Sequence, residues 1–347
     1  MIGRVLPSWC VARPIHTHKR QNAMKHLRNT LCLILFFGIF AISCSTTAST
    51  GELQHTLIST EQRAEMAHEG TISLWFFGVH ELGTKNGESS LVITPEGTTI
   101  LIDAGYGRDH ELLVQLIAET GITHLDYVIF SHFHSDHIGD LARLAEAYEI
   151  GMIFLIDFPE PEESGATLRS TILSTILEKN IPYRTLSRGD MYSFDSSTTL
   201  RCFNPEGPVV YDKSVVDDRT RSVFENNHSM VFTITYGEHS FLYAGDIYKE
   251  REAELIDLFG NQLNSVLLKV PHHGLGTSSS SLFLMQVSPE VQIVNSGEPT
   301  LSTLDSLRFR ARTLTTVAYG TILVISDGKE LRVIPAHEDI TIGVYGE

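Results

Sequence analysis

Four side chains that can bind a metal ion lie within six residues of the chain, in the segment Ser131-His132-Phe133-His134-Ser135-Asp136-His137. Imidazole and carboxylate groups are ligands that zinc and similar divalent cations prefer. The segment follows an apolar stretch that predicts a buried strand, and in extended backbone His132 and His134 point the same way. Asp136 and His137 then turn into the next helix and face a neighbouring position. The segment therefore predicts ligands for two adjacent metal ions, rather than a solvated histidine-rich loop.

This segment has the pattern His-x-His-x-Asp-His, and on this motif the sequence resembles the metallo-β-lactamase superfamily. Three further motifs follow the order of that family: Ile100-Leu101-Ile102-Asp103-Ala104-Gly105, Tyr243-Ala244-Gly245-Asp246 and Lys269-Val270-Pro271-His272-His273-Gly274. The last motif is similar to the branch of competence DNA-uptake proteins (ComEC-like) and to bacterial phosphorylcholine esterases. The resemblance spans about Thr71 to Ile334. It implies an α/β fold, the four-layer αββα metallo-β-lactamase sandwich.

The resemblance implies a ligand set for the first metal. His132 and His134 would be two of its ligands, and the family places a third histidine ahead of the strand that ends at Asp246. His228, in Asn226-Asn227-His228-Ser229, lies at that place in the chain. Asp246 would bridge the two metals. The alternative for His228 is a surface histidine at the start of a strand.

The second metal would be held by Asp136, His137 and one histidine of the pair His272-His273. We favour His272 as the ligand because it directly follows the predicted strand, although His273 is nearly as good a candidate. The expected cofactors are two Zn²⁺ ions, with Mn²⁺ or Fe²⁺ as alternatives.

The expected chemistry is hydrolysis by an activated water molecule. Two metals about 3.5–4 Å apart would hold a hydroxide between them and lower the pKa of the bound water toward 7. Asp136 would orient that hydroxide, and His273, if it is not a ligand, would protonate the leaving oxygen. Asp103 lies at a strand end before Gly105, where its carboxylate would bond to the histidine loop and orient it. An ordinary turn carboxylate is the alternative for Asp103.

A candidate substrate-binding segment precedes His228. The stretch Asn204–Asn227 is the longest one without regular periodicity, and irregular segments of this length are usually functional or disordered. Arg219 and Arg221 are its candidates for contact with a substrate phosphate. A solvated mixed-charge loop is the alternative, because acidic residues of the same stretch offset these charges: Asp212, Asp217 and Asp218.

Alternating strands and helices surround these motifs. Periodicity predicts strands at Ile72–Val79, Ser90–Thr94, Thr98–Asp103, Leu125–Ser131, Met152–Ile156, Met230–Tyr236, Ser240–Ala244, Ser265–Val270, Val291–Asn295, Thr321–Ser326 and Glu330–Ile334. It predicts helices at Arg108–Thr120, Ile138–Tyr148, Ala166–Asn180, Lys249–Phe259 and Leu304–Thr313. The serine-rich run Thr277–Ser281 is interpreted as a helix start rather than as the site of a nucleophile.

The first 44 residues predict export. Residues 1–43 carry six basic residues and no acidic residue, and they end in the apolar run Leu31–Ile42. A basic flank, a short apolar core and small residues are typical of a secretory signal. A membrane span needs about 20 apolar residues, which is longer than this run. A signal that stays in the membrane as an anchor is the alternative.

The end of this segment predicts a lipid anchor. Ala41-Ile42-Ser43-Cys44 resembles a bacterial lipoprotein cleavage site, so Cys44 would be lipidated and would hold the protein at a bacterial membrane, at the outer membrane or cell surface. Residues 1–23 would belong to a misassigned start, because Met24 begins a signal of ordinary length. Residues 45–70 are then a tether, and residues 71–347 form the hydrolase domain.

Cleavage before Cys44 makes the chain strongly acidic. It leaves 20 Lys and Arg against 42 Asp and Glu, a formal charge of −22. Such a surface repels polyanions at long range, which disfavours tight non-specific binding of nucleic acid. Cys202 is the one cysteine left besides Cys44, so no intrachain disulfide is expected.

Together these features predict an exported metal-dependent hydrolase of a phosphodiester, either DNA or a phosphorylcholine-type ester. The resemblance favours DNA, whereas the charge favours a small or zwitterionic substrate. Hydrolysis of a β-lactam or another ester is an alternative, as is a non-catalytic binding lipoprotein at the surface. Competence-type relatives often carry a further histidine near Asn295–Thr300, where this sequence has none, so the pocket is expected to differ there. No protein partner is predicted.

Overall fold

The strand β1 (Ile72–Phe76) belongs to two apolar cores at once. Leu74 and Phe76 pack in a cluster that joins residues of two sheets, whereas Trp75 and the following Phe77 pack in a separate cluster. Successive side chains of a strand point to opposite faces. The side chains of β1 are buried at all five positions, so the strand must be covered on both faces, and this requirement produces layers.

The computed structural model describes residues 70–79, 87–158, 168–210, 220–295 and 299–337. Within these ranges β1 belongs to an eight-stranded sheet with β2 (Ser90–Ile93), β3 (Thr99–Ile102), β4 (His124–Ile129), β5 (Glu149–Leu155), β6 (Tyr183–Thr185), β14 (Ile322–Ser326) and β15 (Leu331–Pro335). The strand order is β15-β14-β1-β2-β3-β4-β5-β6. The strands from β3 to β6 run parallel, and the remaining pairs are antiparallel.

The second sheet has seven strands in the described ranges. They are β7 (Met191–Ser193), β8 (Thr198–Asn204), β9 (Val231–Tyr236), β10 (His239–Tyr243), β11 (Leu267–Lys269), β12 (Val291–Val294) and β13 (Arg312–Thr315), in the order β13-β12-β11-β10-β9-β8-β7. β10 to β13 run parallel. Cys202 of β8 is buried between the sheets and forms no disulfide. Burial raises the pKa of its thiol to about 12.

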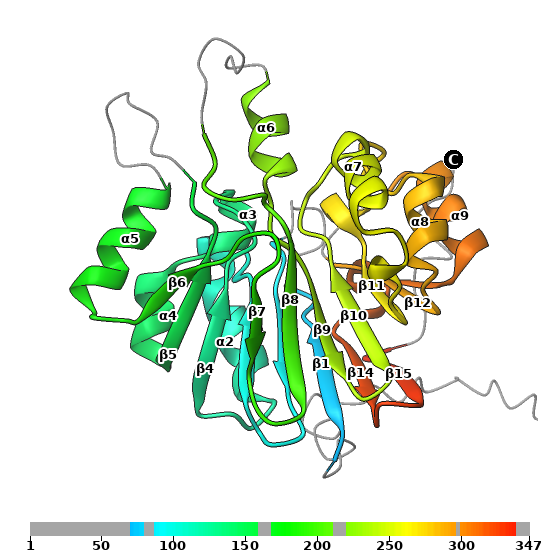
Figure 1. Cartoon of the computed structure of the whole chain (residues 1–347). Helices are drawn as coiled ribbons and strands as arrows, with labels where there is room; N and C mark the ends of the chain where they lie inside the picture. Colours follow the sequence, from blue (N-terminus) through cyan, green and yellow to red (C-terminus); the bar gives the residue numbers. More distant parts are fainter. Residues whose placement is uncertain (1–69, 80–86, 159–167, 211–219, 296–298, 338–347) are drawn as a thin grey trace, which may run out of the picture. The chain divides into compact units, whose positions relative to one another are not determined.

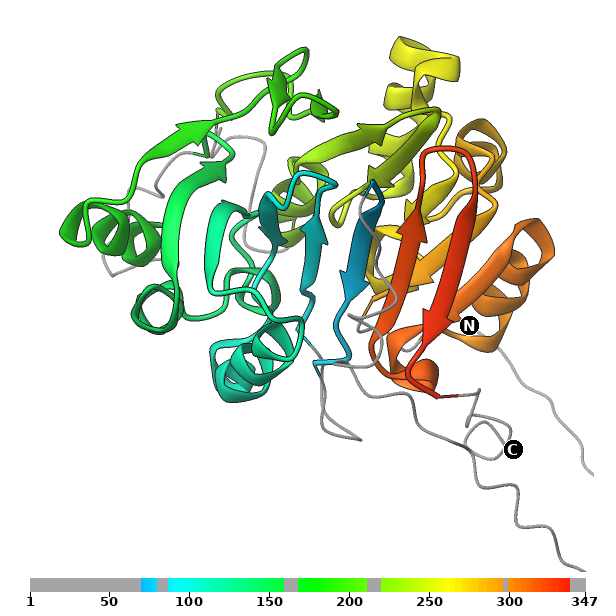
Figure 2. The same cartoon turned by 90° about the horizontal axis from the view of Figure 1, so that it is seen from below.

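Helices cover the outer faces of both sheets (Figures 1 and 2). The first sheet packs against α2 (His110–Ala118), α4 (Leu141–Ala147) and α5 (Leu168–Glu178). The second packs against α7 (Lys249–Phe259), α8 (Ser281–Val287) and α9 (Leu301–Arg310). The result is the expected αββα sandwich of four layers.

Short helices occupy the loops that connect the strands. They are η1 (Gly107–Asp109), α3 (Ser135–Ile138), α6 (Arg221–Asn227), η2 (Gly260–Leu263), η3 (Pro271–Gly274) and α10 (Thr316–Tyr319). Two of them, α3 and α6, differ from the predictions. One helix was predicted over Ile138–Tyr148, and an irregular stretch was predicted as far as Asn227. The chain turns at Gly139, whose φ is +56°, so α3 and α4 are separate. α6 gives the end of the long stretch a regular structure.

Parallel strands bring the chemical motifs to one edge of each sheet. β3 and β4 are parallel neighbours, so the segments after them, which hold Asp103 and the histidine loop, lie at the same edge. β10 and β11 are parallel neighbours in the other sheet and are followed by Asp246 and the His272-His273 pair. In Figure 1, α3 and α6 lie beyond the upper ends of the strands, near both sheets.

The described residues all fall within one compact unit, Leu53–Glu347. None of the helices in the described ranges combines the length and the apolar character that crossing a bilayer requires. The predicted signal, Cys44 and the tether up to residue 69 lie outside the described residues.

Candidate metal centre

One carboxylate oxygen, Oδ2 of Asp246, is the point on which the histidines converge. It lies 3.3 Å from Nε2 of His137, 3.5 Å from Nε2 of His273 and 3.8 Å from Nε2 of His132. His273 Nε2 also lies 3.4 Å from Oδ2 of Asp136. All these side chains except that of Asp136 are almost fully buried. A buried carboxylate surrounded by three imidazole nitrogens has the composition of a metal site.

The outer nitrogens of two rings are fixed by Asp103 and Ser131. Asp103 accepts hydrogen bonds from the backbone N–H of Ser131 (2.7 Å), from its hydroxyl (2.8 Å) and from Nδ1 of His137 (2.8 Å). Since the Ser131 hydroxyl donates to Asp103, it accepts from Nδ1 of His132 at 3.0 Å. Both rings therefore carry their proton on Nδ1 and turn Nε2 toward Asp246. Such outer contacts are typical of histidines that bind metals.

The inner nitrogens of these two rings and of the His273 ring have no hydrogen-bond partner among the described residues. These atoms are Nε2 of His132, of His137 and of His273, and Oδ1 of Asp246 is also buried without one. Buried polar groups are nearly always satisfied, so a cluster of unsatisfied ones needs an explanation. Divalent cations next to these atoms would supply it, and the residues therefore fit a metal centre.

Two groups of potential ligands share Asp246. One contains His132, His134 and Asp246, and the other contains His137, His273, Asp246 and Glu88. The rings of His132 and His134 pack edge to face at 4.6 Å. Because one carboxylate belongs to both groups, the arrangement fits two adjacent cations with Asp246 between them.

The charges of the cluster favour positive charge at its centre. Burial alone would raise the pKa of Asp246, but the imidazoles of His137 and His273 hold it well below the usual value. Burial alone would lower the pKa of both histidines, but Asp246 holds each well above the usual value. Burial and then His137 lower the pKa of His132, which keeps that ring neutral. Bound cations would take the place of the protons that the carboxylates otherwise attract.

The structure places His273, and not His272, in this cluster, which reverses our preference between the two. His272 stacks on Tyr248 with ring centroids 4.9 Å apart, and its Nδ1 lies 2.6 Å from the hydroxyl of Thr277. The physical reason is the backbone of η3, where His272 and His273 have left-handed φ values of 50° and 51°. The chain therefore does not continue in extended form after β11, and the second histidine turns inward.

His228 is likewise placed away from both ligand groups. It follows α6, its Nδ1 donates to the carbonyl of Phe224 at 2.7 Å, and its ring packs against the rings of Phe224 and Phe158. One helical turn earlier, Oε2 of Glu225 lies 2.9 Å from Nε2 of His134. Because α6 continues to Asn227, the carboxylate of Glu225 faces His134. His228 had been predicted at this place, as the third ligand beside His132 and His134.

Arg221 is tied to the same carboxylate. Its Nε lies 2.8 Å from Oε1 of Glu225, so Arg221, Glu225 and His134 form a chain of contacts that leads to the metal cluster. The Arg221 side chain is about two-fifths exposed. Arg219, the other predicted substrate contact, lies outside the described residues.

Glu88 and Lys269 were not predicted from the sequence as residues of the site. Glu88 precedes β2, and Lys269 is the last residue of β11; their side chains are buried, with Nζ and Oε1 2.6 Å apart. Burial would raise the pKa of Glu88 and lower that of Lys269, but each holds the other charged, so the first pKa is lowered and the second raised. A lysine within an otherwise apolar strand was the signal that pointed to a buried partner.

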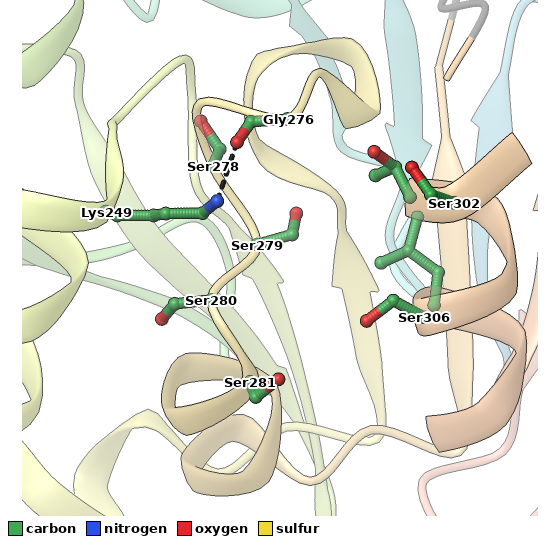
Figure 3. Close-up of a pocket in the computed structure, with 10 residues that line it drawn as sticks. Lys249, Gly276, Ser278, Ser279, Ser280, Ser281, Ser302 and Ser306 are labelled. Carbon is green, nitrogen blue, oxygen red and sulfur yellow. Dashed lines mark hydrogen bonds between the residues drawn. The ribbon is translucent and has the colours of Figure 1, made fainter. Parts of the chain in front are cut away.

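A separate hollow of about 500 Å³ lies beyond the His272 loop, between α7, α8 and α9 (Figure 3). Serine hydroxyls line it, and Nζ of Lys249 at its edge donates to the carbonyl of Gly276 at 2.6 Å. Among the described residues, those that line this hollow include no histidine or carboxylate, so they are distinct from the metal cluster. Ser280 caps α8 by accepting from the N–H of Phe283, which agrees with a helix start at the serine-rich run.

One segment of the chain matches a known protein family. Residues 83–151, which contain the histidine loop, match the family model of the Metallo-beta-lactamase superfamily. Among solved structures, the fold is similar to Igni18, a metallo hydrolase from Ignicoccus hospitalis (14% identity, 76% of this chain and 98% of the other, TM-score 0.44). It is also similar to Tm1679, described as a metal-dependent hydrolase of the β-lactamase superfamily (15% identity, 70% and 95%, TM-score 0.45).

The curated relatives include Competence protein ComA of Neisseria gonorrhoeae, to which the chain is 36% identical over 77 residues, covering 22% of this chain and 11% of the relative. The chain is 24% identical over 293 residues to ComE operon protein 3 of Bacillus subtilis, which covers 81% of this chain and 32% of the relative. It is 28% identical over 261 residues to Recombination protein 2 of Haemophilus influenzae, covering 71% and 28%. It thus spans about a third or less of the length of these relatives. Residues 83–151 thus match a metallo-β-lactamase superfamily domain, and the chain is similar in sequence to relatives of the competence-protein branch.

Proposed function

We propose that this protein is an exported hydrolase that uses two zinc ions to cleave a phosphodiester. The observation that supports this most is the convergence of three imidazole Nε2 atoms on Oδ2 of Asp246, within 3.3–3.8 Å. One carboxylate shared by two ligand groups is the arrangement of two-metal hydrolases, which act on phosphate esters and related substrates.

The residues of the cluster have separable tasks in this proposal. Bound zinc would supply a water molecule activated near neutral pH and would polarise the phosphoryl oxygen. Asp136 lies at the more exposed edge of the cluster, and its carboxylate would orient the attacking water. The ring of His272 lies outside both ligand groups, with Nε2 3.5 Å from Nδ2 of Asn226 and Nδ1 2.6 Å from the hydroxyl of Thr277. In this proposal it would transfer a proton to the leaving oxygen, the role first predicted for His273.

The substrate is proposed to be DNA rather than a phosphorylcholine ester. Two relatives carry names that refer to competence and recombination, and processes of this kind act on polynucleotides. The acidic charge of the mature chain opposes tight binding of a polyanion. We therefore expect weak, salt-sensitive binding and cleavage that depends on the metals and on local basic residues.

A four-substrate comparison tests the proposal. Zinc-loaded protein beginning at Ser45 would be offered bis-p-nitrophenyl phosphate, p-nitrophenyl phosphorylcholine, linear DNA and nitrocefin. We expect hydrolysis of the first and third, abolished in His132→Ala and retained in His124→Ala, whose exposed ring lies outside the cluster. Cleavage of nitrocefin alone would assign the protein to β-lactam hydrolysis instead. No turnover of any of the four, with two zinc ions bound, would contradict the proposal.

Arg221 is proposed to contact the substrate phosphate from the rim of the centre. Replacing Arg221 by alanine should lower kcat/KM for a phosphodiester about tenfold, on the order of 1.4 kcal/mol, without changing the metal content. Steady-state kinetics together with elemental analysis would measure both. Unchanged kinetics in the Arg219→Ala/Arg221→Ala double variant would show that these arginines belong to a solvated loop.

Export and anchoring are proposed from the first 44 residues. If Ala41-Ile42-Ser43-Cys44 is a lipoprotein cleavage site, the mature protein begins at Cys44 and partitions with membranes. Cys44→Ser should then block both processing and incorporation of labelled fatty acid, and Ser45→Ala should leave them intact. Equal solubility and equal size of the wild type and Cys44→Ser would rule out the lipid anchor.

A further inference from the structure

Lys269 connects segments from both sheets behind the metal cluster. Its side chain is 1% exposed, at the end of β11, where an unpaired ammonium would be costly. The Nζ atom lies 2.6 Å from Oε1 of Glu88, 3.1 Å from the carbonyl oxygen of Gly245 and 3.9 Å from Oδ1 of Asp246. Glu88 precedes β2 of the eight-stranded sheet, whereas the other two residues follow β10 of the seven-stranded sheet.

Glu88 lies behind the ring of His273 and not in front of it. Its Oε2 is 3.3 Å from Nδ1 of His273, and the carbonyl of Asn295 lies 3.2 Å from the same nitrogen. The opposite ring nitrogen, Nε2, faces Asp136 and Asp246. A carboxylate oxygen of Glu88 also lies within 4.8 Å of a ligand atom of each of His137, Asp246 and His273, so Glu88 borders the second ligand group while its Oε2 contacts the outer nitrogen of His273.

The backbone of Glu88 reinforces this connection. Its N–H donates to the carbonyl of Asp136 at 2.8 Å, and its carbonyl accepts from the N–H of Gly105 at 2.8 Å. The same residue thus touches the histidine loop through its backbone and His273 through its side chain. Movement of Glu88 would displace ligands that come from both sheets.

We propose that Glu88 and Lys269 form a buried clamp that positions His273 and Asp246 for the second metal. Glu88 holds the Nδ1 edge of His273 so that Nε2 faces the centre, and Lys269 fixes both Glu88 and the Gly245-Asp246 turn. The inference rests on the two-metal centre of the proposed function. Buried ion pairs seldom add net stability over apolar residues, so a positioning task accounts for one at this place.

The clamp acts on the second metal in particular. His273 belongs to the group with His137 and Asp246, whereas His132 and His134 belong to the other group. Loss of the clamp should therefore weaken the second zinc ion about 10- to 100-fold, the range found when outer contacts of metal-binding histidines are removed. The first zinc ion should bind almost as it does in the wild type.

Zinc titration against a competing chelator tests the clamp in Glu88→Gln, Lys269→Met and the double variant of the full mature chain. A clamp predicts that all three weaken the second zinc ion. A purely electrostatic effect predicts the opposite for Lys269→Met, because removal of a positive charge would strengthen cation binding. Tighter binding of the second ion in Lys269→Met, or unchanged affinity in Glu88→Gln, would overturn the proposal.

Glu252→Gln is the matched control. Glu252 is a fully buried carboxylate on α7 that accepts from the backbone N–H groups of Ser279 and Ser280, outside both ligand groups. Its replacement should lower the melting temperature without changing zinc affinity, which separates positioning from general stability. The zinc titration does not depend on the identity of the substrate. A chain that binds two zinc ions but cleaves no phosphodiester would refute the proposed function without contradicting the clamp.

Discussion

Replacing Asp246 by alanine should remove both metal ions and abolish hydrolysis. Asp246 is shared by the two ligand groups, and its Oδ2 lies within 3.8 Å of three imidazole nitrogens. Each metal of such a centre contributes several kcal/mol to the transition state. At 1.36 kcal/mol for each tenfold change in rate, we expect kcat/KM to fall by about 10³-fold or more. Elemental analysis and steady-state kinetics of the same preparation would measure both effects.

Two further variants make this result specific. Asp246→Asn keeps the shape of the side chain and removes its charge, so it tests the site if the alanine variant fails to fold. Asp257→Ala removes an exposed aspartate of α7 and should behave as the wild type. Retention of two zinc ions by Asp246→Asn, with activity near the wild type, would contradict a bridging role.

Replacement of His272 and replacement of His273 by alanine should have different effects on the metal content. His273→Ala should lose the second zinc ion, because its Nε2 faces both Asp136 and Asp246. His272→Ala should keep two zinc ions, because its ring stacks on Tyr248 and bonds to Thr277. We nevertheless expect its kcat to fall by about 10²-fold, the lower end of what a general acid contributes.

The two variants serve as controls for each other, since they differ by one position in the same loop. Zinc content measured after dialysis, together with kcat at saturating substrate, distinguishes them. Loss of a zinc ion from His272→Ala, with two retained in His273→Ala, would restore the original preference for His272 as the ligand.

The order of strands and helices was accessible from the sequence because the periodic signal was strong. The helix Lys249–Phe259 was predicted with the bounds that the structure shows. Four strands were missed: β6, β7, β8 and β13. β13 was missed because Arg312 and Thr313 continue the helical spacing of the preceding residues. Its parallel pairing with β12 prevails over that local preference, and pairing between distant segments is not visible in a single window of sequence.

The metal centre was predictable where ligands stand in an extended segment, as in the histidine loop. It was not predictable where backbone conformation decides the direction of a side chain. The left-handed φ of His272 and His273, and the continuation of α6 to Asn227, determine that His273 and Glu225 face the cluster. Glu88 was overlooked because its partners, Lys269 and His273, are more than 180 residues away in the chain.

The metal content per chain measures directly whether the protein binds two metal ions. Purified mature protein would be stripped with chelator, reconstituted with zinc, dialysed and subjected to elemental analysis. Because two ligand groups share Asp246, we expect close to two zinc ions per chain, with phosphodiester hydrolysis returning as they bind. Less than half an equivalent of zinc per chain after reconstitution would contradict a two-metal centre.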